Sequence, residues 1–150
     1  MCIRDVLNSL AAAAIGFEMG LDAKTIVSGL GTYGGVRRRF EIKGIARDIM
    51  VVDDYAHHPT EVSATLQAAR DGWKRRIVAV FQPHLYSRTK AFYKEFAASF
   101  MDSDILIVTD VYPAREKPIN GVNGKLLFDA AKSAGHKQAH YVPELKDLKE

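Results

Sequence analysis

The sequence predicts an α/β fold in which helices cover a doubly wound, mostly parallel sheet, preceded by a short helical segment. Two continuous apolar runs, residues 77–81 and 105–108, suit strands that are buried on both faces of a parallel sheet. Helical patterns separate and follow these runs, and such alternation is typical of α/β domains. The first 39 residues, by contrast, show helical patterns and no strand.

Two helices are expected in this first stretch. Four apolar side chains share one face at helical spacing and predict a helix over residues 6–19: Leu7, Leu10, Ala11 and Ala14. Gly20 is suited to end this helix, and Asp22 to cap a second one over residues 22–30. Glycines at positions 31, 34 and 35 then break the pattern. The stretch resembles the end of one domain whose start is missing.

The character of the sequence changes after Arg39, where the second domain is expected to begin and to continue over residues 40–150. Residues 40–55 read as two short strands around an Ala-Arg-Asp turn at 46–48. Pro59 can occupy the first position of a helix that runs to about residue 69, because proline has no N–H to lose there. Glu61 suits the first turn of that helix, where a negative charge is favoured.

The remaining elements complete a Rossmann-like order of strands and helices. Ser87 is expected to cap a helix that carries three phenylalanines on one stripe: Phe92, Phe96 and Phe100. Further helix signals run over residues 125–133, and a short strand is expected near Tyr141.

Composition excludes several classes of protein. The 150 residues carry a net charge of +3, with basic and acidic residues intermixed, which is too mild to indicate nucleic-acid binding. The apolar stretch at residues 7–15 is too short to cross a membrane. Cys2 is the single cysteine, so no internal disulfide is possible, and the chain suits a reducing cytoplasm. We therefore expect a cytoplasmic domain that binds neither nucleic acid nor membrane.

Three predicted strands are followed by polar segments rich in His, Arg, Asp and Tyr, at residues 53–61, 82–89 and 109–116. Ligands of open α/β sheets bind outside the carboxyl ends of the strands. We therefore expect these three segments to meet at one edge of the sheet and to form a binding site there.

Other kinds of site fit the sequence less well. Five residues have side chains that bind metals: Asp53, Asp54, His57, His58 and His84. Neighbours in an extended segment point in opposite directions, however, so we assign no metal site. Ser87 is better explained as a helix cap than as a nucleophile, and His58 as a surface or packing residue before Pro59. Gly124 and Lys125 resemble the end of a P-loop, but Leu126 replaces the required Ser or Thr.

Several motifs resemble those of the Mur ligase family. The specific ones are Asp-Asp-Tyr-Ala-His-His-Pro-Thr-Glu-Val at 53–62, Phe-Gln-Pro-His at 81–84 and Tyr-Ser-Arg-Thr at 86–89. Supporting fragments lie at residues 6–12 and 35–41 and around Tyr112-Pro113 with Glu116, Pro118 and Ile119, in the family's order.

The resemblance implies an ATP-dependent carbon–nitrogen ligase with three domains that acts in peptidoglycan synthesis, and hence in cell shape and division. Such an enzyme phosphorylates the carboxylate of UDP-N-acetylmuramate with ATP and Mg²⁺, and the amine of L-alanine then attacks the acyl phosphate. Residues 1–39 would be the end of the central ATP-binding domain, and residues 40–150 a carboxy-terminal domain truncated at its end. The phosphate and sugar sites would lie in missing domains that this chain contacts, so the fragment alone would be inactive.

The resemblance also implies roles for individual residues. Asp54 would hold the ATP ribose, and Arg39 would lie near the nucleotide. Four residues would surround the amino-acid substrate: Tyr55, His57, His84 and Arg88. His57 and Arg88 would be catalytic, since a histidine can assist deprotonation of the amine and a guanidinium fork suits a carboxylate.

Departures from the family's pattern leave alternatives open. Leu85 stands where several relatives have a second Arg, Arg115 where a Gly is common, and Arg4-Asp5 where a His-Asn pair is expected. One alternative is the murein-recycling ligase, which attaches a preformed peptide to the same sugar; it usually departs from the Phe-Gln-Pro-His motif. The other is a nucleotide-binding module without catalysis.

Overall fold

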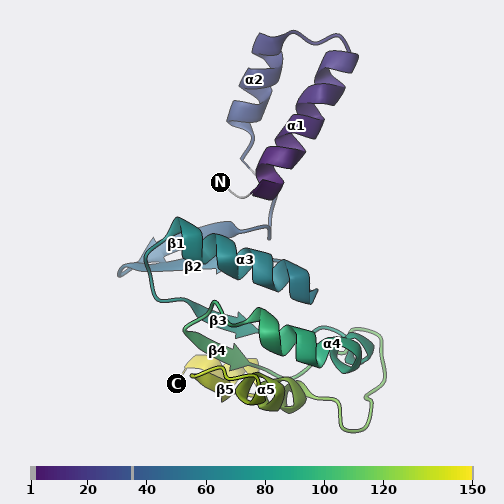
Figure 1. Ribbon diagram of the computed structural model, residues 1–150, viewed down its shortest axis with the longest axis vertical. Coiled ribbons are helices and arrows are strands. Elements are labelled where there is room, and N and C mark those ends of the chain that lie inside the picture. Colours follow the sequence, from purple (N-terminus) through teal and green to yellow (C-terminus); the bar gives the residue numbers. More distant parts are fainter. Residues whose placement is uncertain (1–2, 35, 150) are drawn as a thin grey trace. The chain divides into compact units, whose positions relative to one another are not determined.

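The computed structural model describes residues 3–34 and 36–149 (Figure 1). The chain divides into two compact units, Met1–Tyr55 and Ala56–Glu150. Cys2, Gly35 and Glu150 lie outside the described residues, as do the side chains of Arg4 and Asp5.

The first unit begins with the two predicted helices, α1 (Ile3–Glu18) and α2 (Ala23–Thr32). Asp22 caps α2 as expected, because its carboxylate accepts the backbone N–H of Thr25 at 2.8 Å. The two helices approach closely at Gly16, where an added Cβ would lie 3.0 Å from Ile26.

A β-hairpin completes the first unit and confirms the strands expected around residues 46–48. Strand β1 (Glu41–Ala46) pairs antiparallel with β2 (Ile49–Asp53). Arg47 and Asp48 both have positive φ angles, 48° and 63°, as a two-residue type I′ turn requires. The hairpin is a sheet of its own. The expectation that residues 53–61 follow a strand of the main sheet is therefore wrong.

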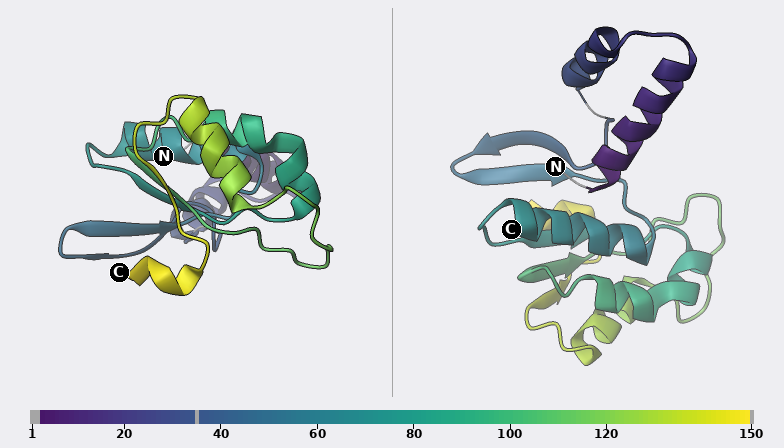
Figure 2. Two further views of the ribbon diagram at one scale, coloured as in Figure 1. Left: turned by 90° about the horizontal axis from the view of Figure 1, so that it is seen from below. Right: turned by 45° about the horizontal axis from the view of Figure 1, so that its top comes forward.

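The second unit is built on a parallel sheet, which confirms the predicted α/β class. Strands β3 (Val78–Phe81), β4 (Ile105–Val108) and β5 (Ala139–Tyr141) lie in the order β3-β4-β5. Helices α3 (Pro59–Gly72), α4 (Tyr86–Ser99) and α5 (Gly124–Ser133) cover one face of this sheet (Figure 2). A 3₁₀ helix, η1 (Leu145–Lys149), follows β5.

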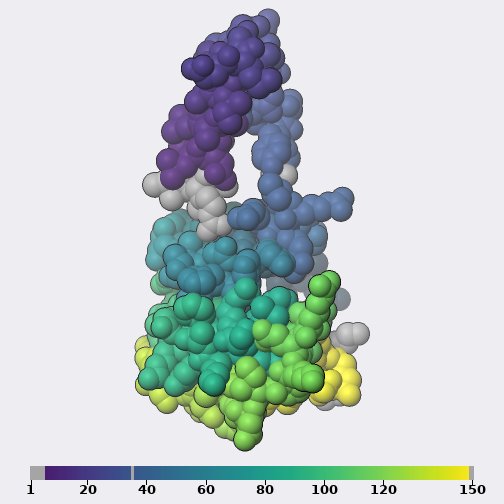
Figure 3. All heavy atoms as spheres, turned by 90° about the vertical axis from the view of Figure 1, so that its right-hand side faces the viewer, coloured from purple at the N-terminus to yellow at the C-terminus, as the bar shows by residue number. Residues whose placement is uncertain are grey.

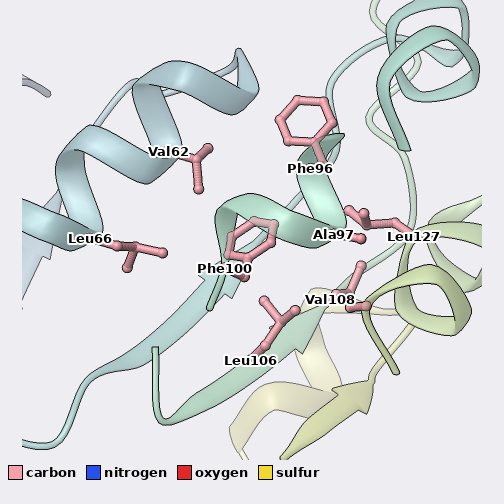
Figure 4. Close-up of a cluster of buried hydrophobic side chains, with 9 residues drawn as sticks. Val62, Leu66, Phe96, Ala97, Phe100, Leu106, Val108 and Leu127 are labelled. Carbon is pink, nitrogen blue, oxygen red and sulfur yellow. The ribbon is translucent and has the colours of Figure 1, made fainter. Parts of the chain in front are cut away.

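The core lies between β4 and the three helices (Figure 4). Leu106 and Val108 of β4 are completely buried, and Phe96 of α4 and Phe100, the residue just after the helix, pack beside them. The ring of Phe81 lies 5.2 Å and 5.0 Å from these two phenylalanine rings. The predicted stripe on α4 is therefore the face that the helix buries, although non-helical angles at Phe92 kink the helix.

Strand β3 differs from the expectation that it is buried on both faces. Val78 and Val80 are 47% and 55% exposed, while the alternate residues Ala79 and Phe81 pack against the core. In the described sheet β3 is an edge strand, and all three helices contact the same face. An apolar run predicts a strand, but it does not say how many of its faces are covered.

The start of α3 agrees with its sequence signals. Pro59 occupies the first turn, and His58 caps the helix by accepting the N–H of Thr60, with Glu61 completing a capping box. His58 also packs edge-on against the ring of Phe92 at 5.1 Å, so it is the packing residue that was expected. None of the described helices is long and apolar enough to span a membrane.

Candidate functional site

Two of the three predicted segments meet beyond the carboxyl ends of β3 and β4. The backbone N–H of Leu85 donates to Tyr112 O at 3.0 Å, and that of Tyr112 donates to Pro83 O at 2.8 Å. These bonds extend the parallel pairing past the strands and place His84 opposite Tyr112. Segments 82–89 and 109–116 therefore meet at one edge of the sheet, as expected for segments that follow neighbouring strands of a parallel sheet.

His84, Arg88 and Tyr112 form a cluster at this edge. Nη1 of Arg88 lies 3.5 Å from Nδ1 of His84, and the rings of His84 and Tyr112 stack with centroids 5.6 Å apart. The His84 imidazole and the Arg88 guanidinium therefore lie side by side, and both groups can donate N–H bonds to an anionic group.

The backbone that precedes this helix is strained. Leu85 has a φ of 72°, a value that non-glycine residues rarely adopt, and its side chain cannot cap α4. Its carbonyl accepts the hydroxyl of the buried Thr89 at 2.8 Å, and its N–H bonds to Tyr112. Strain of this kind persists where surrounding contacts hold it, and functional sites are common places for it.

The prediction that Ser87 caps α4 is wrong. The helix begins at Tyr86, and Ser87 lies inside its first turn. Glu116, from the loop after β4, supplies the cap: its Oε2 accepts the N–H of Ser87 at 2.9 Å, and its Oε1 accepts the Ser87 hydroxyl. The hydroxyl bond, and next the backbone bond, lower the pKa of Glu116 from its ordinary value. Sequence reasoning noted Glu116 as part of a motif but gave it no role.

His57 lies at the start of α3 beside a carboxylate. Its Nδ1 is 3.4 Å from Oε2 of Glu61, which also accepts the backbone N–H groups of His57 and His58 at 3.0 Å and 3.1 Å. Glu61 thus lies against the His57 ring and orients it. The spacing of four residues was a signal for this pair that sequence reasoning did not use.

The remaining predicted residues, Arg39, Asp54 and Tyr55, belong to the first unit. Asp54 is half-buried, and its Oδ2 accepts the N–H of Phe40 at 2.8 Å. The guanidinium of Arg38 lies 4.8 Å from the centre of the Tyr55 ring, and Arg38 O accepts the N–H of Tyr55. Arg39 is exposed. These residues flank the hairpin at its open end.

The P-loop-like Gly124 has a structural role. Its N–H donates to Oδ1 of Asp110 at 3.0 Å, and Asn123 caps α5 through the N–H of Leu126. A Cβ on Gly124 would lie 2.1 Å from the carbonyl oxygen of Thr109, so glycine is required by close packing. Side chains of the protein therefore fill this helix end, which leaves no cradle for phosphate.

Asp110 also binds a tyrosine. The hydroxyl of Tyr141 donates to Asp110 Oδ1 at 2.7 Å. Burial, and then the hydrogen bond and charge of Asp110, raise the pKa of Tyr141 to about 12. Among residues 3–34 and 36–149, no three or more His, Cys, Asp or Glu side chains form a group that could hold a metal ion.

A parallel sheet with polar side chains gathered at its carboxyl edge defines an α/β ligand-binding domain. The profile of one family, described as Mur ligase, glutamate ligase domain, matches residues 38–150. The chain belongs to the Mur ligase family.

Its relatives include a protein of Salinibacter ruber named UDP-N-acetylmuramate–L-alanine ligase, 56% identical over 147 residues, which cover 97% of this chain and 31% of the relative. The crystal structure of UDP-N-acetylmuramate–alanine ligase from Thermotoga maritima matches with a TM-score of 0.81 and 34% identity, over 99% of this chain and 31% of that one. A murein peptide ligase from Psychrobacter arcticus matches with a TM-score of 0.65 and 27% identity, over 95% and 29%. The chain thus spans about a third of the length of these relatives.

Proposed function

We propose that this chain is part of an ATP-dependent ligase that joins L-alanine to UDP-N-acetylmuramate through an acyl phosphate, in cytoplasmic peptidoglycan synthesis. The observation that carries the proposal is the 56% identity, over 97% of the chain, to a relative with that name. In this proposal residues 1–39 form the end of the central domain, and residues 40–150 belong to the carboxy-terminal domain. The profile match, which begins at residue 38, supports that division.

The cluster at the sheet edge would bind the carboxylate of L-alanine. Arg88 offers a planar fork of N–H donors, and the adjacent imidazole of His84 offers a further polar group. Both groups are partly buried, so their attraction for a carboxylate is less screened than on an open surface.

His57 would take the proton that the amine of L-alanine must lose. Glu61 lies 3.4 Å from Nδ1 and orients the ring, which suits a histidine that exchanges a proton with the substrate. A base oriented by a carboxylate is a common arrangement in general base catalysis. Tyr55 would complete the surroundings of the amino acid.

ATP would be contacted by Asp54 and Arg39. The Asp54 carboxylate is fixed by the N–H of Phe40 and is partly exposed, which fits a group that accepts ribose hydroxyls. Exposed Arg39 fits a contact with phosphate. The described residues hold no cluster of metal ligands, and we assign Mg²⁺, with the ATP phosphates, to other parts of the ligase.

A second candidate function is attachment of a preformed peptide, as the name of the Psychrobacter arcticus relative suggests. The match to that relative is weaker in identity, 27% against 34%, and in TM-score, 0.65 against 0.81. Both comparisons favour the alanine ligase. No specific observation favours a nucleotide-binding module without catalysis.

The proposal is tested by incubating the complete protein with UDP-N-acetylmuramate, L-alanine, ATP and Mg²⁺ and measuring phosphate release and product mass. We expect one phosphate for each L-alanyl product. The 150-residue chain alone should give none, because it contains no P-loop. Failure of the complete protein to form the product, or turnover by these 150 residues alone, would overturn the proposal.

A further inference from the structure

Glu116 joins two parts of the second unit that are 29 positions apart in the sequence. It lies in the loop between β4 and α5, which is largely exposed on the surface (Figure 3). Its carboxylate reaches the first turn of α4 and binds both the backbone N–H and the hydroxyl of Ser87. The residue that follows Ser87 is Arg88.

The first turn of a helix attracts anions, because its N–H groups lack partners within the helix. In α4 the protein's own carboxylate occupies this place, since Leu85, the residue at the cap position, has no side-chain acceptor. The hydrogen bonds from Ser87 stabilise the ionised carboxylate and lower the pKa of Glu116 from its ordinary value. An incoming carboxylate therefore meets a site already filled at Ser87.

The same loop is attached to the start of α4 at a second point. Tyr112 stacks on His84 and exchanges backbone hydrogen bonds with Pro83 and Leu85. Attachment at Tyr112 and at Glu116 fixes the loop at both sides of the helix start. Arg88 is the residue that follows the second attachment point, in the same first turn of α4.

We propose that Glu116 is a positioning residue of the ligase: it caps α4, fixes the turn that carries Arg88, and leaves Arg88 as the anchor for the substrate carboxylate. This rests on the proposed function, because Arg88 is assigned there to L-alanine. Glu116 acts through Ser87 and Arg88 and does not touch the substrate.

The test compares kinetics of complete ligases. Glu116→Ala should raise the KM for L-alanine about tenfold, the scale of one lost helix cap, while kcat and the KM for ATP stay unchanged. Glu116→Gln keeps an acceptor oxygen and Ser87→Ala keeps the backbone donor, so each should show part of the rise. Lys117→Ala, an exposed neighbour in the same loop, is the matched control and should behave as wild type.

An unchanged KM for L-alanine in Glu116→Ala overturns the proposal, and so does an equal rise in the KM values for L-alanine and ATP, which would indicate a general loss of structure. If Glu116→Ala does not fold, the KM values for L-alanine and ATP in Glu116→Gln and Ser87→Ala test the proposal in the same way.

A second measurement separates this proposal from the function of the ligase. Amide hydrogen exchange of Ser87, followed by NMR in the 150-residue chain, should be faster in Glu116→Gln than in wild type, while α5 amides are unchanged. Equal Ser87 exchange rates in Glu116→Gln and wild type would show that Glu116 does not cap α4, even if the complete protein ligates L-alanine. A protected Ser87 amide in a protein that does not ligate L-alanine would reject the proposed function and leave the cap in place.

Discussion

Nη1 of Arg88 lies 3.5 Å from Nδ1 of His84, across one turn of chain where β3 passes into α4. Because this contact lies beyond the carboxyl end of β3, where ligands of parallel sheets bind, Arg88 should be the main anchor of the L-alanine carboxylate. Arg88→Ala in the complete ligase should raise the KM for L-alanine by about ten- to a hundredfold. Arg88→Lys should restore binding only in part, because a point charge does not reproduce the fork.

Arg115→Ala is the matched control, since this exposed arginine lies in the adjoining loop. Steady-state kinetics with L-alanine and ATP varied separately provide the measurement. A defect of Arg88→Ala that falls mainly on ATP would show that Arg88 is assigned to the wrong substrate.

Asp54 should act on ATP. Asp54→Ala should raise the KM for ATP by roughly ten- to a hundredfold, the scale of a charge-assisted hydrogen bond. Asp54→Asn separates binding from folding, because its amide oxygen can still accept the N–H of Phe40. Asp53→Asn, the neighbouring carboxylate that pairs with Arg38 at 3.7 Å, should leave the KM for ATP unchanged. Stoichiometric binding of zinc or manganese that Asp54→Ala abolishes would instead support a metal site.

Gly124→Ala should destabilise the second unit, because the new Cβ would lie 2.1 Å from the carbonyl oxygen of Thr109. The expected loss is about 1–3 kcal/mol in the free energy of unfolding, typical of an overpacked core. Gly72→Ala is the matched control: no heavy atom lies within 4 Å of its added Cβ, and alanine favours the helix. Urea unfolding measures both variants, and equal stability of Gly124→Ala and wild type would contradict the close packing.

Tyr141 should make stability depend on alkaline pH. Its folded-state pKa, about 12, lies above the usual tyrosine value of 10.0, so the protonated phenol contributes stability below pH 10. That contribution is lost as pH rises through about 12. Ultraviolet titration should show a late tyrosine step that Tyr141→Phe removes. A late step that persists in Tyr141→Phe belongs to another of the six tyrosines and would refute the assignment.

Local signals predicted most of the elements because their causes are local. The turn at Arg47-Asp48, the cap at Asp22 and Pro59 at the start of α3 all depend on residues within one turn of each other. The phenylalanine stripe of α4 likewise states which face is buried, since helical spacing and burial coincide there.

The errors have causes that no local pattern contains. Ser87 was a reasonable cap by spacing, but the acceptor comes from Glu116 in a distant loop. Val80 belongs to an apolar run, yet it is exposed because the three helices cover only the opposite face of the described sheet. The strand before Asp54 pairs within a separate hairpin, so the segment that follows it does not lie at the carboxyl edge of the parallel sheet by that pairing. Segments 82–89 and 109–116 meet as expected because both follow strands of one parallel sheet.

The central claim, that these residues belong to a ligase for free L-alanine, is tested most directly by substrate choice. The complete protein is given UDP-N-acetylmuramate, ATP and Mg²⁺ with either L-alanine or a preformed peptide that begins with L-alanine, and kcat/KM is measured for each. The account predicts a preference for L-alanine of about a hundredfold or more in kcat/KM. Arg88→Ala should reduce kcat/KM for L-alanine more than kcat/KM for the peptide. Equal use of both substrates, or a preference for the peptide, would contradict it.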